Sequence, residues 1–541
     1  MASEKQSKAI PLSHHLSEVA KARKPSPLKG LSKYFKQEGV LSLAGGLPSP
    51  AYFPLSGLSV DALVSDSFAL APTERSSSFS WLWKLLGSSS FKKERTTAIS
   101  IPKYSATPDD INLAAALQYG AAVAQPQLQN FLRDFVMQVY QPAFEDFTVL
   151  IDTGNTDGWC RAFGTLCNPG QGVLMEEWTY PSALASMMPA GVDPVSVPMD
   201  GEGMKSDALE KLLSEWDEEA RQMSRPHVMY IVPVGQNPCG TTMGATRKKQ
   251  IYEICVKYDI IIVEDDPYYF MQLGTYEMKS QRSSVASPVS HRSGDEARFI
   301  ASLEPSFLKY DYQGRVIRLD TFSKTIAPGA RLGFFTCNPV FAERFERQGE
   351  TSTQSPCGFG QSIVTKILTT WKYEGYIRWL QGLRTEYQQR RDFFVDCLAD
   401  EFHLQATPAV AGIWEGCTMY RAFSKPSVLN TNEKLLSQSR ALFSFIPPNS
   451  GMFVWLKLNL EDHPSFTPDD EGTLETKLWA RLAENGVIFA PGWFFTTDDL
   501  ASSEPSAGHF RISYSNAEYG DLKKAVNIFG RVIREFFDEQ V

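Results

Sequence analysis

Polar residues follow four apolar segments of the chain, and their side chains have complementary chemistry. A glycine-rich turn follows the first segment, an amide the second, and a carboxylate and a phenol the third. A lysine with hydroxyls and an arginine follows the fourth. The residues are Gly154-Asn155-Thr156, Gln236-Asn237, Asp265-Asp266-Pro267-Tyr268, and Thr321-Phe322-Ser323-Lys324 with Arg331. Because ligands of open α/β sheets bind beyond the carboxyl ends of the strands, these residues predict one shared site.

Lys324 is the candidate nucleophile of this site. It follows Ser323 directly and lies seven positions before Arg331. A lysine that forms a Schiff base must lose its proton well below its free pKa of about 10.4. Burial near other positive charge lowers a lysine pKa in this way. A lone lysine is more often a solvated surface charge, so the prediction depends on the neighbouring residues.

Two adjacent carboxylates, Asp265 and Asp266, end an apolar segment over residues 260–266. An unpaired carboxylate in a buried strand is costly, so a partner is needed. The residues by themselves leave both carboxylates open as the one that faces a ligand.

Several donors at these segment ends suit an anionic group such as a phosphate. Ser323 offers a hydroxyl, and Arg331 offers a guanidinium fork that can bind two oxygens. The backbone N–H groups of Asn155 and Thr156, at an expected helix start, add further donors.

Apolar runs and helical patterns alternate along the middle of the chain. Six short runs are continuously apolar, as strands of a sheet covered on both faces should be. They are residues 147–152, 172–177, 228–234, 260–266, 316–322 and 332–337. Helical patterns over 206–223 and 245–258 lie between them, which predicts an α/β fold with a mostly parallel, doubly wound sheet. A long charged helix over 376–403 and strands at 451–458 and 509–515 predict a smaller α+β domain after it.

Composition excludes several classes of protein. The chain has 541 residues, of which 43% are hydrophobic and 21% charged, and this is typical of a folded globular protein. Its formal net charge of −9 argues against nucleic acid or an anionic membrane as the partner. No uncharged apolar run reaches the roughly 18 residues of a spanning helix. The eight cysteines form no CxxC pair and no zinc pattern, so we expect no metal and a reducing compartment, the cytoplasm.

The segments TFSKTIAPGARLG, GQNPCG and EDDPYYF resemble those of class I pyridoxal-phosphate aminotransferases of fold type I. The resemblance extends to residues 42–54, 116–120, 177–185, 449–456 and 510–514, and covers the chain from about Lys24 onward. Within this class the chain is most similar to fungal aromatic-amino-acid aminotransferases, which are related to kynurenine/α-aminoadipate aminotransferases.

The resemblance implies a role for the residues closest to the reaction. Lys324 would bind pyridoxal phosphate covalently and move the substrate α-proton. Asp265 would pair with the pyridine nitrogen, because the family's Asp-x-x-Tyr spacing then places Tyr268 beside the ring 3′-oxygen. Asn237 would donate to that same oxygen and also lie beside the substrate.

The remaining roles are also implied by the resemblance. Tyr180 would stack on the cofactor ring, and Thr321 takes a position that is usually Ser or Gly. Tyr119 would cross to the partner's phosphate in a homodimer with shared active sites. Arg511 would bind the substrate α-carboxylate, with Gly46 beside the substrate.

The predicted reaction moves the amino group of Phe, Tyr or Trp to 2-oxoglutarate by a ping-pong mechanism. Two alternatives stay open: an α-aminoadipate/kynurenine-type or specialised-pathway aminotransferase, and a lyase or decarboxylase on the same fold. A ligand-sensing domain beside a DNA-binding head is disfavoured, because only some 25 residues precede the matched region.

Three domains are expected: an N-terminal arm with part of the small domain (1–104), a large cofactor-binding domain (105–375) and a C-terminal small domain (376–541). Polar stretches at about 72–100, 277–299 and 420–442 are interpreted as insertions.

Overall fold

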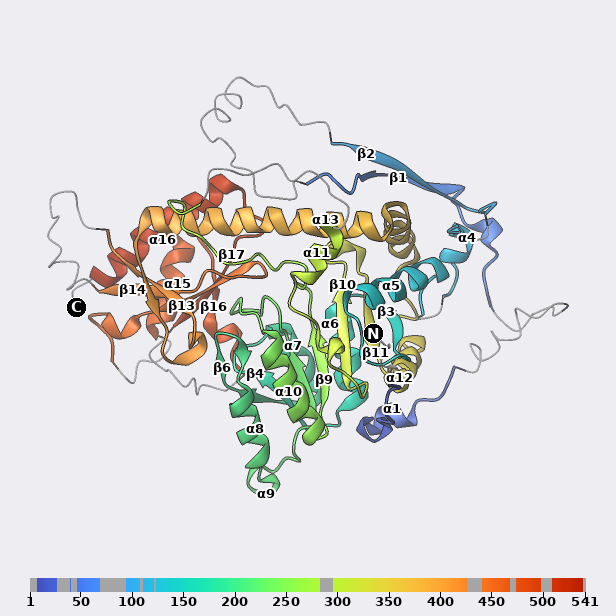
Figure 1. The fold of residues 1–541 in the computed structure, drawn as a ribbon, viewed down its shortest axis with the longest axis horizontal. Helices are drawn as coiled ribbons and strands as arrows, with labels where there is room; N and C mark the ends of the chain where they lie inside the picture. Colours follow the sequence, from blue (N-terminus) through green and yellow to red (C-terminus); the bar gives the residue numbers. More distant parts are fainter. Residues whose placement is uncertain are drawn as a thin grey trace.

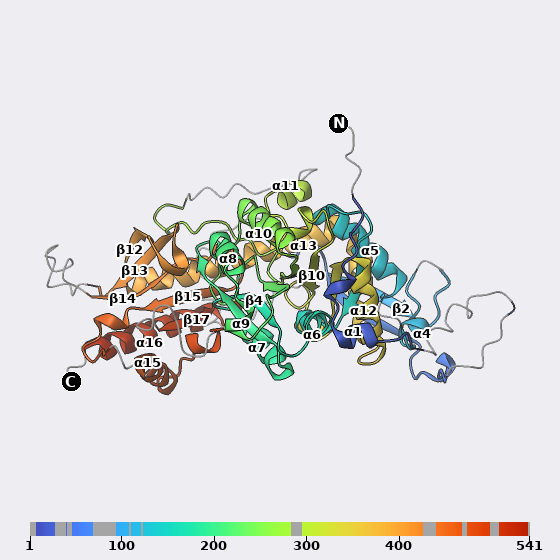
Figure 2. The same ribbon diagram turned by 90° about the horizontal axis from the view of Figure 1, so that it is seen from below.

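Two β-sheets of unequal size, joined by a long helix, organise the protein (Figures 1 and 2). The computed structural model describes residues 7–26, 39, 46–68, 94–107, 110–120, 123–282, 295–425, 440–467, 473–497 and 508–538. The larger sheet lies among the green and yellow elements of Figure 1, and the smaller one among the orange and red elements.

The larger sheet has seven strands in the order β3-β11-β10-β9-β8-β4-β5. Their bounds are β3 Thr148–Asp152, β4 Gly172–Glu176, β5 Asp193–Val197, β8 Val228–Ile231, β9 Ile261–Asp265, β10 Val316–Thr321 and β11 Gly333–Cys337. Only β11 runs antiparallel to its neighbours in this sheet. The mostly parallel α/β sheet is therefore confirmed, and each of the six apolar runs forms a strand. The additional strand, β5, escaped prediction because its sequence, DPVSV, is short and half polar.

Helices cover this sheet. They are α5 Pro126–Val139, α6 Asn155–Leu166, α7 Pro181–Met187, α8 Ser206–Ser214, α9 Glu218–Arg221, α10 Ala245–Lys257, α11 Asp295–Ala301 and α12 Pro339–Glu350. The single helix expected over 206–223 is instead α8 followed by α9. The Asp217 side chain accepts hydrogen bonds from the backbone N–H groups of Glu219 and Ala220, so a second helix begins there. A short ribbon, β6 Met199–Asp200 and β7 Gly203–Met204, precedes α8.

The smaller sheet is antiparallel, with the order β12-β13-β14-β15-β17-β16. Its strands are β12 His403–Pro408, β13 Thr418–Phe423, β14 Ala441–Phe445, β15 Phe453–Leu458, β16 Ala490–Pro491 and β17 His509–Ser513. The helices α15 Thr473–Glu484 and α16 Tyr519–Asp538 accompany it.

A long helix, α13 (Gly358–Glu401), extends from the larger sheet to the smaller one (Figure 1). It begins well before the expected residue 376. Lys372 has a φ of 58°, so α13 consists of two helical parts that meet there. The expected domain boundary at 375/376 falls inside this helix, and the division into domains stays a prediction.

An antiparallel hairpin precedes the larger sheet. Its strands are β1 Gly57–Leu63 and β2 Thr96–Pro102, and the short helix α4 (Leu113–Ala116) follows. Because β2 begins at Thr96, the stretch interpreted as an insertion over 72–100 ends before that residue; its residues 72–93 lie outside the described chain. The other two proposed insertions are also mostly outside it, over 283–294 and 426–439. Their edges belong to α11, β13 and β14.

The N-terminal segment docks on the elements around the larger sheet through buried residues and a polar cluster. It carries the short helix α1 (Glu18–Ala22). His14 and His15 each place Nε2 within 3.1 Å of the Asp259 carboxylate, which also accepts a hydrogen bond from Arg315. These two histidines and Asp259 have the atom types of a metal site, but Arg315 already neutralises the carboxylate. We therefore interpret the cluster as a polar contact that holds the N-terminal segment against Asp259 and Arg315. Among the described residues, no helix is both long and apolar enough to cross a membrane.

Candidate active site

Lys324 lies in the turn that follows β10, at the carboxyl edge of the larger sheet. It is half-buried, and burial is the main cause that lowers its pKa below the ordinary lysine value. The positive charges of Arg511 and Arg331 lower it further. The structure thus brings residues from distant parts of the sequence around a lysine that gives up its proton more easily than usual.

Asp265, the last residue of β9, is buried and held by two neutral donors. The Tyr230 hydroxyl donates to Oδ2, and the Asn155 side-chain amide donates to Oδ1, both at 2.6 Å. Burial raises the pKa of Asp265, and these two hydrogen bonds oppose that rise. Because neither donor carries a charge, the carboxylate keeps its capacity to pair with a cation of a ligand.

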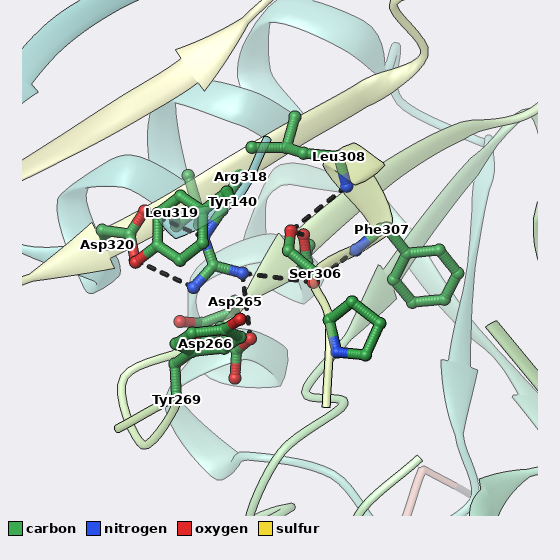
Figure 3. A network of polar contacts seen from close by, with 12 residues as sticks. Tyr140, Asp265, Asp266, Tyr269, Ser306, Phe307, Leu308, Arg318, Leu319 and Asp320 are labelled. Carbon is green, nitrogen blue, oxygen red and sulfur yellow. Dashed lines mark hydrogen bonds and ion pairs between the residues drawn. The ribbon is translucent and has the colours of Figure 1, made fainter. Parts of the chain in front are cut away.

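Asp266 belongs to a different network, shown in Figure 3. Its Oδ2 accepts a hydrogen bond of 2.9 Å from the fully buried guanidinium of Arg318. The same guanidinium pairs with Glu264 and Asp320 and lies over the ring of Tyr140 at 3.9 Å. Burial raises the pKa of Asp266 to about 7. The charge of Arg318 opposes this rise, so the carboxylate of Asp266 already has a cationic partner inside the protein.

Arg511, in β17, reaches toward the same site from the smaller sheet. Its Nη1 donates to Asn237 Oδ1 at 2.7 Å, and its guanidinium lies 4.2 Å and 4.8 Å from the ring centres of Phe453 and Phe495. No carboxylate of the described residues forms an ion pair with it. Its buried Nε also has no hydrogen-bond partner among the residues that the structure describes. An oriented guanidinium of this kind is suited to bind a substrate carboxylate in a bidentate manner.

Two tyrosines complete this side. Tyr268 is buried, and its ring meets Phe453 edge to face at 5.8 Å. Burial raises its pKa, whereas the nearby Arg511 opposes the rise. Tyr180 precedes α7 and is close enough to both Tyr268 and Arg511 to influence their pKa values. The side chains of Tyr268 and Tyr180 therefore lie near the guanidinium of Arg511.

The residues predicted to bind a phosphate also come together. Arg331 Nη1 lies 3.5 Å from Ser323 Oγ, which accepts a hydrogen bond of 2.9 Å from Thr321. Gly154 immediately precedes α6, whose first residues are Asn155 and Thr156. It has a φ of 104°, and a Cβ there would lie 2.8 Å from Arg331 Nη2. The positive φ favours glycine at this position, and a side chain there would also force the Arg331 guanidinium to move.

Two predicted residues are not gathered with the others in the single chain. A Cβ on Gly46 would meet no atom within 4 Å, and the Tyr119 side chain is 64% exposed. Conversely, the sequence analysis missed Tyr230 and the side-chain role of Asn155 toward Asp265. No local motif marks Tyr230, because it lies in the middle of an apolar strand.

Comparisons with known proteins identify the family of the chain. A family model described as "Aminotransferase class I and II" matches residues 86–529. The chain belongs to this family. As an aminotransferase it uses pyridoxal phosphate, and the predicted enzyme class and cofactor are confirmed.

Individual relatives cover almost the whole aminotransferase chain. An aromatic amino acid aminotransferase of Schizosaccharomyces pombe is 33% identical, over 97% of this chain and 98% of its own length. An L-tyrosine:2-oxoglutarate aminotransferase of Tapinella panuoides is 31% identical, over 98% and 97%. The solved structure of the Candida albicans aminotransferase Aro8 has a TM-score of 0.79 and 32% identity, over 98% of this chain and 100% of that one.

The residues of this aminotransferase fit the cofactor. Asp265 is a buried carboxylate held by the neutral donors Tyr230 and Asn155, which suits a protonated pyridine nitrogen. The guanidinium fork of Arg331, which lies close to Gly154 at the start of α6, suits a phosphate. Lys324 has a lowered pKa, as an amine that forms an imine requires.

Proposed function

We propose that this aminotransferase transfers the amino group of an aromatic L-amino acid to 2-oxoglutarate. The observation that carries the proposal is the setting of Arg511, a half-buried guanidinium between Phe453 and Phe495. An α-carboxylate can bind the fork while an aromatic side chain packs among neighbouring rings. The names of the relatives from S. pombe and T. panuoides support the same choice.

In this proposal each side chain has one task. Pyridoxal phosphate, when bound, supplies an electron sink for the charge that develops on the substrate α-carbon. Asp265 keeps a proton on the pyridine nitrogen, and Arg511 orients the α-carboxylate. Lys324, as a neutral amine, would take the proton from the substrate α-carbon and deliver it to the 4′-carbon of the cofactor.

Further residues hold the cofactor in the proposal. Asn237 and Tyr268 donate to the ring 3′-oxygen, and Tyr180 covers the ring. The phosphate would be held by the side chains of Ser323, Thr321 and Arg331 and would accept hydrogen bonds from the N–H groups of Asn155 and Thr156. Gly46, which is not gathered with these residues in the single chain, is proposed to lie beside the substrate.

The proposal includes a homodimer with shared active sites. Large side chains near α4 are exposed in the single chain, among them Tyr52 (85%) and Tyr119 (64%). Gln118 links this region to residue 48 by a hydrogen bond to the Pro48 carbonyl. A partner that covers this surface would place Tyr119 at its phosphate. Size-exclusion chromatography with light scattering tests this, because a monomer at micromolar concentration would contradict it.

The proposed location is the cytoplasm. All eight cysteines are free thiols in the structure, as a reducing compartment requires. Imaging of a fluorescent fusion tests this, and an organelle pattern would contradict it.

A half-reaction screen tests the substrate assignment. The purified enzyme is mixed with single amino acids, and the loss of absorbance of the bound cofactor is followed. Phenylalanine, tyrosine and tryptophan should react with kcat/KM at least tenfold above that of aspartate, about 1.4 kcal/mol of transition-state binding. A preference for α-aminoadipate or kynurenine would favour the alternative substrate class instead. Release of ammonia would indicate a lyase, and release of carbon dioxide a decarboxylase, if adding an oxo acid does not restore the original absorbance of the bound cofactor.

A further inference from the structure

The turn that carries Lys324 is compact, and the hydrogen bonds within its backbone all go to one carbonyl group, that of Phe322. The backbone N–H groups of Thr325, Ile326 and Ala327 donate to the carbonyl of Phe322, at 3.3, 2.9 and 3.0 Å. Phe322 in turn donates to the Leu332 carbonyl at 3.0 Å. These bonds shape the turn without fixing how far it projects from the sheet.

Helix α13 contributes a second set of restraints, at the residue directly after Lys324. The Trp379 indole donates to the Thr325 carbonyl at 2.7 Å, and the Tyr376 hydroxyl donates to Thr325 Oγ1 at 3.1 Å. All three side chains are buried, so water cannot readily replace either bond. Tyr376 and Trp379 are three residues apart, and this spacing places them on one face of the helix.

The same helix also holds the backbone that follows Arg511. Arg390 Nε donates to the Tyr514 carbonyl at 2.9 Å, and its Nη2 donates to the Ala517 carbonyl. Arg391 Nη1 donates to the Pro448 carbonyl at 2.9 Å. One continuous stretch of α13, after Lys372, therefore contacts the chain next to Lys324 and the chain next to Arg511.

We propose that Tyr376 and Trp379 are positioning residues for Lys324, which hold Thr325 on α13 and so fix how deeply the lysine enters the site. The inference rests on the proposed role of Lys324. The low pKa of this lysine comes first from burial and then from Arg511 and Arg331, so it depends on depth. If the turn moves outward, burial decreases and the lysine behaves more like a free one.

The test uses Trp379→Phe alone and together with Tyr376→Phe. Tyr376→Phe removes only the hydroxyl donor, whereas Trp379→Phe removes the indole donor and also makes the buried ring smaller, so its control must reproduce that loss of size. Trp371→Phe is the matched control: its ring centre lies 5.0 Å from that of Trp379, so the change removes the same ring size from the same cluster, but its indole donates to the Leu63 carbonyl at 3.1 Å and not to Thr325. The first readout is the pH dependence of Lys324 acetylation by trace acetic anhydride in the cofactor-free protein, measured by mass spectrometry. The second is kcat and KM for phenylalanine.

In the Trp379→Phe variant the midpoint of Lys324 acetylation should move to higher pH by about half a unit or more. The kcat should fall about tenfold, with KM changed less, because a misplaced base affects the proton transfer more than binding. The double variant should show larger changes, and Trp371→Phe should match the wild type in both readouts.

The proposal is overturned if Trp379→Phe and the double variant behave like Trp371→Phe. It is also overturned if kcat falls while the acetylation midpoint stays unchanged, because the loss would then come from general damage to the helix. Acetylation is measured without cofactor or substrate. It therefore tests the positioning of the lysine even if Lys324→Ala proves active and the proposed function fails.

Discussion

Asp265 and Asp266 are neighbours in the chain, yet their side chains belong to different hydrogen-bond networks. Asp265 is held by Tyr230 and Asn155, which are neutral. Asp266 is held by Arg318, whose guanidinium also pairs with other carboxylates (Figure 3). Both are buried, and burial raises the pKa of each.

The difference between neutral and cationic partners shows how a buried carboxylate can stay available to a ligand. On the side of Asp266 the protein supplies its own cation, so the charge contributes to the interior structure. On the side of Asp265 the neighbours only hydrogen-bond, and the negative charge stays available to a cationic ring nitrogen. The site is thus a place where the fold leaves an electrostatic interaction incomplete.

The largest effect is expected at Lys324, on the side of Asp265. Lys324→Ala should abolish transamination and leave a folded protein that still binds pyridoxal phosphate noncovalently, because the rest of the site is intact. The change is measured by steady-state assay and by the absorbance of the bound cofactor. Lys309→Ala, at an exposed lysine outside the site, is the control. An active Lys324→Ala enzyme without added amines would refute the assignment.

The second prediction sets the two carboxylates against each other. Asp265→Asn should lower kcat by about 10³-fold, or about 4 kcal/mol, because the ring nitrogen loses its ion partner. Asp266→Asn should change kcat by less than about tenfold, since an amide oxygen can still accept from Arg318. Equal losses, or the reverse order, would show that the wrong carboxylate was chosen.

A smaller effect is expected at the carboxylate-binding arginine. Arg511→Lys should raise KM for phenylalanine by about 30-fold, or about 2 kcal/mol, because a point charge cannot form the bidentate pair. Arg421→Lys is a matched control, since this strand arginine also lies over a ring, that of Phe423. An unchanged KM in Arg511→Lys would remove the arginine from the substrate site.

The smallest effect concerns stability and pH at Asp266. In the folded protein its pKa is about 7, whereas its ordinary value is 3.8. A raised carboxyl pKa stabilises the folded state at acid pH, and this contribution is lost as the pH rises through 7. The free energy of unfolding of the wild type minus that of Asp266→Asn should therefore decrease from pH 5 to pH 8, by about 1 kcal/mol or more. Urea unfolding at both pH values measures it, and a constant or increasing difference would contradict the account.

Much of this arrangement could be predicted from the sequence, because it depends on local patterns. The apolar runs before Asp265 and Lys324 are long enough to identify buried strands, and polar residues directly after such strands must gather at one edge of a sheet. The family resemblance then separated Asp265 from Asp266 through the spacing to Tyr268. The Arg318 network explains that choice in physical terms.

Other features could not be predicted because they depend on contacts between distant segments. Tyr230 and Arg318 stand inside apolar strands, where nothing in the neighbouring sequence shows what they meet. The contacts of Trp379 with Thr325 join residues 54 positions apart, and only the path of α13 brings them together. The part of α13 before residue 376, with its break at Lys372, was not predicted; no proline or glycine stands at position 372 to mark the break.

The most direct test of the contrast between the two carboxylates is the protonation state of the bound ring nitrogen. Cofactor-free wild type, Asp265→Asn and Asp266→Asn proteins are loaded with pyridoxal phosphate labelled with ¹⁵N in the ring, and the nitrogen chemical shift is measured at neutral pH. The account predicts a protonated nitrogen in the wild type and in Asp266→Asn, and an unprotonated one in Asp265→Asn. A nitrogen that stays protonated in Asp265→Asn and loses its proton in Asp266→Asn would contradict it.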